Sequence, residues 1–437
     1  MAIRGIESLD STSNDPDKPV SLIVDHVVTQ HAEGASFLWL LRDGAVFRPD
    51  YSLVDLAKLD NRLEAHLDGL RIAGEAGWNL VQESLFFSES GELFVAAELS
   101  FESGAQKRID AVSKMAANNP EATRGIVSAL GWLPYEQARP YIQDFLASSS
   151  PRLRHIGVAA SAIHRQYPGA FLPDAMSDND PLLRARAFRA AGELARTELL
   201  PKLQSGFADP DQNVRFAAAW SATLLSVNLH SLTVLRAIAA SPDPNSAKAL
   251  QLTVRRMDLA AAKAWQASLS KQKVNLRLAI IAAGAIGDPD GVPWLKKQMN
   301  LSPMARVAGE AFTMITGIDL AYQDLEKRAP EGFEAGPTEN PEDENVEMDT
   351  DENLPWPDPV SIQKWWSNNQ SQFQKGTRYL LGKPITIEWL QEVLRIGRQR
   401  QRAAAALELA IRQPGQPLFE VRAPGFRQQA LLGLSSR

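Results

Sequence analysis

The sequence contains no cysteine among its 437 residues. This absence excludes disulfides, thiolate metal sites and thiol nucleophiles. Other chemical signatures are missing as well: no two histidines have the four-residue spacing of a zinc-binding helix, and neither a glycine-rich phosphate loop nor a Gly-x-Ser-x-Gly elbow occurs. The sequence therefore predicts no catalytic residue, no cofactor and no metal ligand, and we expect a protein that is not an enzyme.

The charge composition is balanced and slightly acidic, with 46 Lys and Arg against 52 Asp and Glu and a net charge of -6. A nucleic-acid-binding protein usually carries a basic stripe, so we expect no nucleic-acid partner. The polar first 19 residues lack the features of a signal peptide, and charged residues interrupt the apolar stretch at 20–41. We therefore expect a cytoplasmic protein with a disordered tail at 1–19 and no membrane segment.

One arginine recurs along the middle of the chain at intervals of 29 to 31 residues, with a single double interval of 62. The double interval contains a degenerate copy in which Ala247 takes the place of the arginine. A period near thirty with two helices per unit is typical of an α-solenoid. The arginines of this series are Arg124, Arg154, Arg184, Arg215, Arg277 and Arg306.

Each copy has the same internal order. A turn such as Asp180-Pro181 ends one helix and begins the next, because proline is tolerated in a first helical turn and aspartate accepts hydrogen bonds from its free amides. Apolar residues then follow at helical spacing, and most of them are small, which lets neighbouring helices approach closely. In the copy at Arg184 these positions are Leu183, Ala187, Ala190, Ala191 and Leu194.

The copy that begins at Asp209-Pro210 carries Val-Arg and then Ala-Ala, and this pattern resembles the HEAT repeat. The resemblance implies stacked helical hairpins, and it implies a ladder in which an aspartate and an arginine join each unit to the next. Because Ala247 has replaced one arginine, the ladder is expected to be interrupted there. The residues that carry the resemblance are Asp209, Pro210, Val214, Arg215, Ala218 and Ala219.

The predicted fold is all-α: a solenoid of HEAT-like hairpins at residues 118–330, preceded by a helical N-terminal cap at 1–117. Residues 331–353 hold ten carboxylates and no basic residue, so we expect an acidic disordered linker there. Residues 354–437 hold twelve Lys or Arg and five Asp or Glu and are expected to form a C-terminal helical region. This basic region is a candidate to bind the acidic linker or the acidic body of the protein.

Three segments, at residues 56–77, 305–320 and 397–429, resemble a bacterial family of HEAT-containing proteins found beside type VI secretion genes. That resemblance implies a cytoplasmic adaptor or chaperone-like accessory in the loading of a secretion spike or effector. The expected partner is therefore a protein. Two alternatives remain open: an immunity protein that blocks a neighbouring toxin, with the acidic linker as a substrate mimic, and a HEAT-like lyase enzyme.

Positions at offsets of 2, 6 and 9 from the apolar residue before each arginine point away from the apolar stripe. Aromatic side chains and arginine at such positions are the usual anchors of protein interfaces. We therefore predict an exposed protein-binding patch on the concave face, and the alternative is that neighbouring helices cover its aromatic residues. The residues of this predicted patch are Trp132, His155, Arg189, Phe216 and Trp220.

Overall fold

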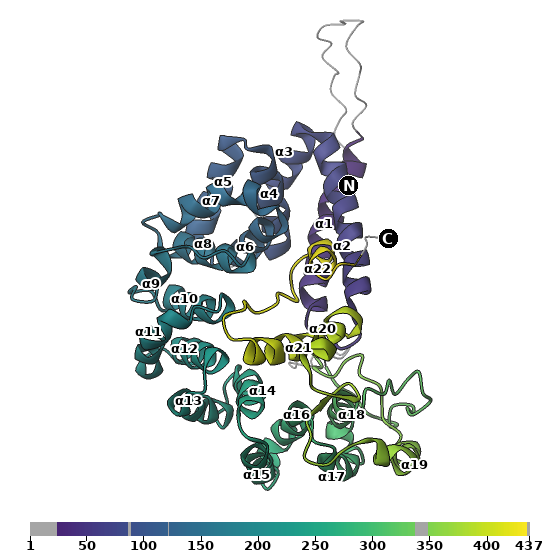
Figure 1. The fold of residues 1–437 in the computed structure, drawn as a ribbon. Coiled ribbons are helices and arrows are strands. Elements are labelled where there is room, and N and C mark those ends of the chain that lie inside the picture. Colours follow the sequence, from purple (N-terminus) through teal and green to yellow (C-terminus); the bar gives the residue numbers. More distant parts are fainter. Residues whose placement is uncertain (1–23, 86–88, 121, 337–347, 435–437) are drawn as a thin grey trace, which may run out of the picture.

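The helices follow one another around an arc, and the C-terminal region lies across the open side of that arc (Figure 1). The structure is a computed structural model that describes residues 24–85, 89–120, 122–336 and 348–434. The predicted tail at 1–19 lies outside these ranges, as do residues 337–347 of the predicted acidic linker. No helix within the described ranges has the length and apolarity needed to cross a membrane.

The first part of the described chain is helical, as predicted. A capping box between Ser52 and Asp55 begins the second helix, and the leucines predicted to share one face of that helix, from Leu53 to Leu67, are all buried. The helices of this part are α1 (Asp25–Ala45), α2 (Leu53–Ala73), α3 (Glu75–Ser84), α4 (Ser90–Ser103) and α5 (Gln106–Asn118).

The repeat array has two layers of helices. The helices that carry the periodic positions form the inner layer, which faces the C-terminal region, and the shorter helices between them form the outer layer (Figure 1). The inner helices are α6 (Ala122–Trp132), α8 (Pro151–Ile163), α10 (Pro181–Glu193), α12 (Gln212–Leu225), α14 (Ser246–Arg256), α16 (Leu276–Ile286) and α18 (Ser302–Thr316). The outer helices are α7 (Tyr135–Leu146), α9 (Phe171–Ala175), α11 (Leu200–Ser205), α13 (Leu229–Ala239), α15 (Leu259–Leu269) and α17 (Val292–Gln298).

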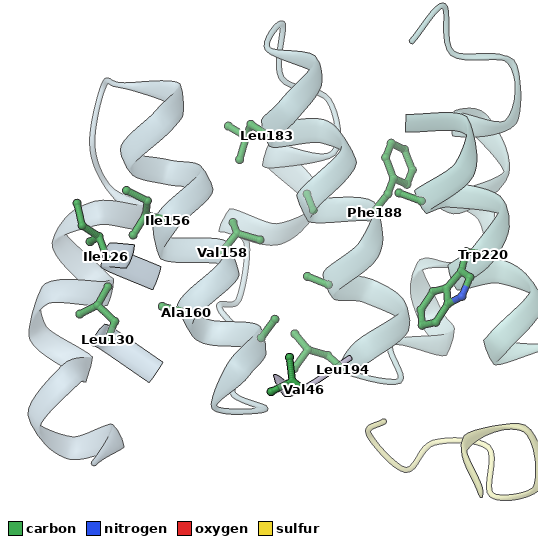
Figure 2. Packing of buried hydrophobic residues seen from close by; sticks show 14 of the residues in the cluster. Val46, Ile126, Leu130, Ile156, Val158, Ala160, Leu183, Phe188, Leu194 and Trp220 are labelled. Atoms are coloured by element: carbon green, nitrogen blue, oxygen red, sulfur yellow. The ribbon is translucent and has the colours of Figure 1, made fainter. Parts of the chain in front are cut away.

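Short 3-10 turns lead into or out of several outer helices: η2 (Thr197–Leu199), η3 (Gly206–Ala208), η4 (Lys273–Asn275) and η5 (Pro289–Gly291). The core lies between neighbouring inner helices, whose buried side chains meet in Figure 2. The apolar positions predicted on α10, from Leu183 to Leu194, are all buried, which confirms the predicted stripe. Close helix packing explains the small residues, because a Cβ on Gly192 would come within 2.9 Å of the Ser221 Cα atom.

The ladder implied by the HEAT resemblance is present in part. Arg154 on α8 pairs with Asp178 at 2.5 Å, and Arg184 on α10 pairs with both carboxylate oxygens of Asp209 at 3.0 and 3.1 Å. Each arginine also donates to two carbonyls of its own turn, five and six residues earlier in the chain. Arg215 keeps only these carbonyl bonds within the described residues, at the place where Ala247 interrupts the series.

The turns before α10 and α12 each contain two aspartates with different roles, Asp178 and Asp180 in the first and Asp209 and Asp211 in the second. In the turn before α12, Asp209 accepts from the backbone N–H of Asp211 and from Arg184, while Asp211 caps the helix by accepting from Val214. The predicted cap at Asp209 is therefore wrong by two residues, because the arginine of the preceding repeat already occupies the Asp209 carboxylate. Burial alone would raise the pKa of Asp209, but hydrogen bonds from Arg184 and the Asp211 backbone hold it below its usual value.

The end of the acidic segment continues this pattern. Asp349 accepts from the Asp351 backbone N–H and pairs with Arg306 at 2.7 Å. Asp351, which is buried, pairs with Arg277 through both carboxylate oxygens. For residues 348–353 the expectation of a disordered linker therefore fails. Carboxylates two residues apart supply the ion pairs that the last two arginines of the array would take from a following repeat.

The C-terminal region folds back into the arc (Figure 1). Its elements are α19 (Pro359–Asn369), η6 (Gln370–Gln372), β1 (Tyr379–Leu380), β2 (Lys383–Pro384), α20 (Ile387–Ile396), α21 (Gln399–Arg412) and α22 (Gly425–Leu431). The strands β1 and β2 pair antiparallel, with Tyr379 opposite Pro384, and this hairpin binds the ends of α16 and α18 through backbone hydrogen bonds. Most of this region is helical, as predicted for residues 354–437, and α21 packs inside the arc against α12 and α14.

The chain between α21 and α22 crosses the concave face, and we name residues 413–424 the C-terminal strap. At the end of the strap, Asp60 on α2 accepts from the Gly425 N–H at 2.5 Å and from Arg42 on α1 at 3.0 Å. Arg42 also donates to the Ala423 carbonyl at 2.9 Å. Gly425 must be glycine here, because a Cβ would come within 2.7 Å of the Ala57 Cα atom. This buried network fixes α22 against α2 and closes the arc into a ring.

Candidate functional site

A cavity of about 600 Å³ lies between the inner helices and the C-terminal strap. Each of α6, α8, α10, α12 and α14 contributes lining residues, α1 supplies Arg42 and Asp43, and the strap supplies Glu420 and Arg422. We name this space the concave cavity. Its size is within the range of ligand-binding sites in proteins. The concave cavity forms because the fold brings the strap next to helices that lie far earlier in the chain.

Four of the five residues of the predicted patch line the concave cavity: Trp132, His155, Arg189 and Phe216. They come from four successive inner helices, so the helical period does place them on one surface. Trp220 lies one turn beyond Phe216 on α12 and lines a second cavity of about 440 Å³ on the other side of the strap. Arg189 lines both cavities and lies over the Trp220 ring, with its guanidinium carbon 3.3 Å from the ring centroid.

The predicted exposure of these aromatic side chains is wrong. Phe216 is 7% exposed, Trp220 is 2% exposed and Trp132 is 3% exposed. Trp132 is covered by Phe426, whose ring stands edge-on at 6.1 Å, and it donates its indole N–H to Glu64. The alternative of covered aromatics is therefore correct: Phe426 of the C-terminal region covers part of Trp132, and Arg189 of the neighbouring inner helix covers Trp220. In Figure 2 the C-terminal segment passes close to Trp220.

A half-buried ion-pair cluster lies between the two cavities. Glu193 at the end of α10 accepts from Arg186 at 2.8 Å and from Arg189 at 3.0 Å. Burial alone would raise the pKa of Glu193, but Arg186, Arg189 and Arg165 lower it to about 2. The carboxylate is therefore ionised over the whole physiological range, and it holds two arginine side chains at the cavity wall.

His155 on α8 is half-buried beside the same cluster. Burial is the main reason that its pKa falls to about 4, and the nearby Arg186 lowers it further. His155 is therefore neutral at physiological pH. His164, at the end of α8, forms a hydrogen bond with the Leu130 carbonyl at 2.8 Å, and its pKa also falls to about 4, mainly through burial. His164 is therefore a hydrogen-bonded, half-buried histidine that is neutral at physiological pH.

The C-terminal strap lies on the concave face as an extended peptide. Its Leu418 N–H donates to the Glu193 carbonyl at 3.0 Å, and the Leu418 carbonyl accepts from Arg165 at 2.6 Å. Arg165 also pairs with the strap carboxylate of Glu420 at 3.2 Å. Arg165 has a positive φ of 56°, which is uncommon for residues other than glycine. The wall of the solenoid thus binds both the backbone and an acidic side chain of a peptide.

Sequence reasoning missed the strap and several charged residues of the cavity, including Lys248 and Arg422. Lys248 lies one residue after Ala247, in the copy that lost its arginine, so the repeat pattern directed attention away from it. Arg422 follows the array by about a hundred residues, and no local pattern connects the two. The excess of basic residues in 354–437 was the available signal, because it predicted contact with an acidic surface.

Within the described residues no group of three His, Cys, Asp or Glu side chains is placed to hold a metal ion. The cavity instead offers arginine, lysine and aromatic side chains beside apolar ones. Such a lining is suited to binding acidic and apolar groups of another molecule.

Comparison with known proteins supports the HEAT assignment. Residues 169–254 match the family model described as HEAT repeats. The comparison with curated proteins finds no match. Among solved structures, the crystal structure of an engineered protein from the Northeast Structural Genomics Consortium matches with 15% identity and a TM-score of 0.32, over 66% of this chain and 94% of that chain.

The match to HEAT repeats covers α9 to α14, where the arginine ladder and the double-aspartate turns occur. The protein is therefore an all-α solenoid that contains HEAT repeats. Arrays of this class generally present extended concave surfaces to protein partners. In this chain the concave surface is partly occupied by its own C-terminal strap, and what remains open is the pair of cavities on either side of the strap.

Proposed function

We propose that this protein is a non-enzymatic scaffold that holds a protein partner at the concave cavity. The observation that carries the proposal is the convergence of five successive inner helices, α1 and the strap on one open cavity. A rigid ring with a preformed cavity binds without a large ordering cost, which favours specific binding. The predicted patch contributes here through Arg189, His155 and Phe216 as cavity walls rather than as an exposed stripe.

The finer part of the proposal is the biological setting. The segments at 56–77, 305–320 and 397–429 resemble the bacterial family found beside type VI secretion genes. We infer from that resemblance a cytoplasmic adaptor or chaperone-like accessory that handles a secretion spike component or an effector. These segments contribute α2, α18 and α21, and α2 and α21 take part in the closure of the ring. The third segment also contains the strap residues Glu420 and Arg422 of the cavity wall, so the proposal assigns the shared residues both to ring closure and to part of the binding surface.

The test is affinity purification of the tagged protein from its native host, followed by mass spectrometry. Ala185→Trp fills the cavity from α10, and Ala264→Trp places the same bulk on the exposed surface of the outer helix α15. We expect a spike component or effector to be recovered with the wild type and with Ala264→Trp, and lost with Ala185→Trp. A partner that all three proteins retain would refute the cavity as the binding site. A toxin partner whose growth inhibition this protein relieves would replace the adaptor with an immunity role.

A further inference from the structure

Four basic side chains from distant parts of the chain meet at the concave cavity: Arg124 on α6, Arg189 on α10, Lys248 on α14 and Arg422 on the strap. We name them the basic cluster. Arg124 pairs with Asp43, and Arg422 is 3.9 Å from the same carboxylate. Arg189 shares Glu193 with Arg186. The side chain of Lys248 forms no ion pair or hydrogen bond with any part of the chain that the structure describes.

The basic cluster contains more positive charge than its neighbours neutralise. Burial lowers the pKa of Lys248, and the positive charges of Arg189 and Arg422 lower it further. Burial and Arg422 act in the same direction on the pKa of Arg124. The Nη1 atom of Arg186 is buried at the same wall and has no hydrogen-bond partner within the described ranges. A carboxylate placed among these groups would relieve repulsion between like charges and satisfy an unpaired donor.

The charge excess extends over both cavities beside the strap. Together they are lined by ten Lys or Arg and four Asp or Glu. Three of the ten basic residues, Arg42, Arg255 and Arg277, pair with carboxylates outside the lining, so an excess of three positive charges remains, whereas the whole chain has a net charge of -6. The concave face is therefore a basic region on an acidic protein. Such a local excess of positive charge attracts an acidic partner.

The strap indicates that the natural occupant is a peptide segment rather than a small anion. It lies on the same wall as an extended chain, with its backbone bonded to Glu193 and Arg165 and with Glu420 held by Arg165. Apolar surface lies beside the basic cluster, from Trp132, Ile163 and Phe216. Phosphate makes no use of apolar surface, whereas a peptide that carries both carboxylates and apolar side chains does.

We propose that the concave cavity binds an extended acidic segment of the partner protein, with carboxylates at the basic cluster and an apolar side chain against Phe216. This inference rests on the proposed scaffold function and specifies the chemistry of its partner. The segment lies alongside the strap, and Lys248 and Arg422 bind it from opposite sides. The acidic segment therefore completes a charge arrangement that the free protein leaves unbalanced.

The test uses the full-length protein and a fluorescein-labelled peptide of ten glutamates with two leucines at its centre. Fluorescence anisotropy is measured for this peptide, for its lysine counterpart and for a ten-nucleotide oligo-dT. We expect saturable binding of the glutamate peptide, stronger than of the other two probes. Lys248→Glu is expected to weaken it on the order of tenfold or more, since it reverses a charge at the site. Lys271→Glu, an exposed lysine after α15, is the matched control and is expected to change the affinity by less than about twofold.

Three outcomes would overturn this inference: no saturable binding of the glutamate peptide, an equal loss in both variants, or tighter binding of oligo-dT than of the peptide. Equal thermal unfolding midpoints for both variants exclude misfolding as the cause. The proposed function is tested separately by the host purification. A host partner that Lys248→Glu still recovers at wild-type levels refutes the acidic segment and leaves the scaffold intact. Binding of the glutamate peptide, together with recovery of no host partner, supports the acidic-segment site and refutes the proposed scaffold function.

Discussion

Loss of the Asp60 carboxylate is expected to release the C-terminal strap and open the ring. Asp60 is 1% exposed and Arg42 is 5% exposed, and their side chains are joined at 3.0 Å. In Asp60→Ala the Arg42 charge stays buried with only the Ala423 carbonyl as a hydrogen-bond partner, and the Gly425 N–H loses its acceptor. Removal of one member of a buried ion pair costs about 3–5 kcal/mol. The free energy that holds α22 on α2 is therefore expected to fall by about that amount.

Hydrogen exchange measures this effect directly. A cost of about 3–5 kcal/mol corresponds to an increase of roughly two to four orders of magnitude in the local opening equilibrium. Amides of residues 418–432 are expected to exchange faster by that factor, while those of the outer helices α7 and α13 change little. Asp68→Ala on the same helix removes an exposed carboxylate and is expected to cost less than about 1 kcal/mol.

A second variant tests whether the loss of protection comes from the unpaired charge of Arg42 or from the loss of side-chain packing. Arg42→Met combined with Asp60→Leu removes both members of the pair and leaves no buried charge, so most of the protection of residues 418–432 is expected to return. The reasoning is refuted if Asp60→Ala raises exchange in this segment by less than about threefold. It is also refuted if exchange rises equally in α7 and α13, because the pair would then support the whole fold rather than the closure of the ring.

Three further predictions concern the array itself. Arg184→Ala is expected to destabilise the protein by about 1–2 kcal/mol more than Arg215→Ala in urea unfolding, since Arg184 alone of the two pairs with a carboxylate; equal effects would contradict the ladder. His155 and His164 have pKa values lowered to about 4, below the unfolded value of about 6.5, so their contribution to stability is complete above pH 6.5 and is lost as the pH falls toward 4. Thermal unfolding of His155→Gln/His164→Gln between pH 6.5 and 4.5 should therefore depend less on pH than that of the wild type, and an unchanged dependence would refute this assignment. Asp351→Ala removes the bidentate partner of Arg277 and is expected to speed hydrogen exchange in residues 348–353 at least about tenfold, with little change in α16; slow exchange in the variant would show that the ion pair does not hold the segment.

The repeat architecture could be predicted from the sequence because it depends on local patterns. The arginine period, the Asp-Pro turns and the small apolar stripe each repeat within thirty residues. The same period placed Trp132, His155, Arg189 and Phe216 on one surface, and four inner helices bring these residues to one cavity. Local periodicity thus predicts which side of a helix a residue occupies.

The cover over that surface could not be predicted in the same way. Trp220 lines one cavity together with strap residues that lie almost two hundred residues further along the chain, and no local pattern places them there. The order of residues 348–353 at the end of the acidic segment could not be predicted from composition either. Its composition predicts disorder, yet Asp349 and Asp351 copy the aspartate spacing of Asp178–Asp180 and Asp209–Asp211 in the repeats. A search for that spacing, rather than for overall charge, would have identified the segment that binds Arg277 and Arg306.

Site-specific photo-crosslinking tests the central claim most directly, namely that a protein partner binds inside the ring. A benzophenone amino acid replaces Lys248 at the concave cavity in one variant and Lys271 on the outer surface in the other, and each protein is irradiated in the native host. We predict a covalent adduct with one partner protein from position 248 and none from position 271. Adducts from position 271 alone, or equal adducts from both positions, would contradict the account.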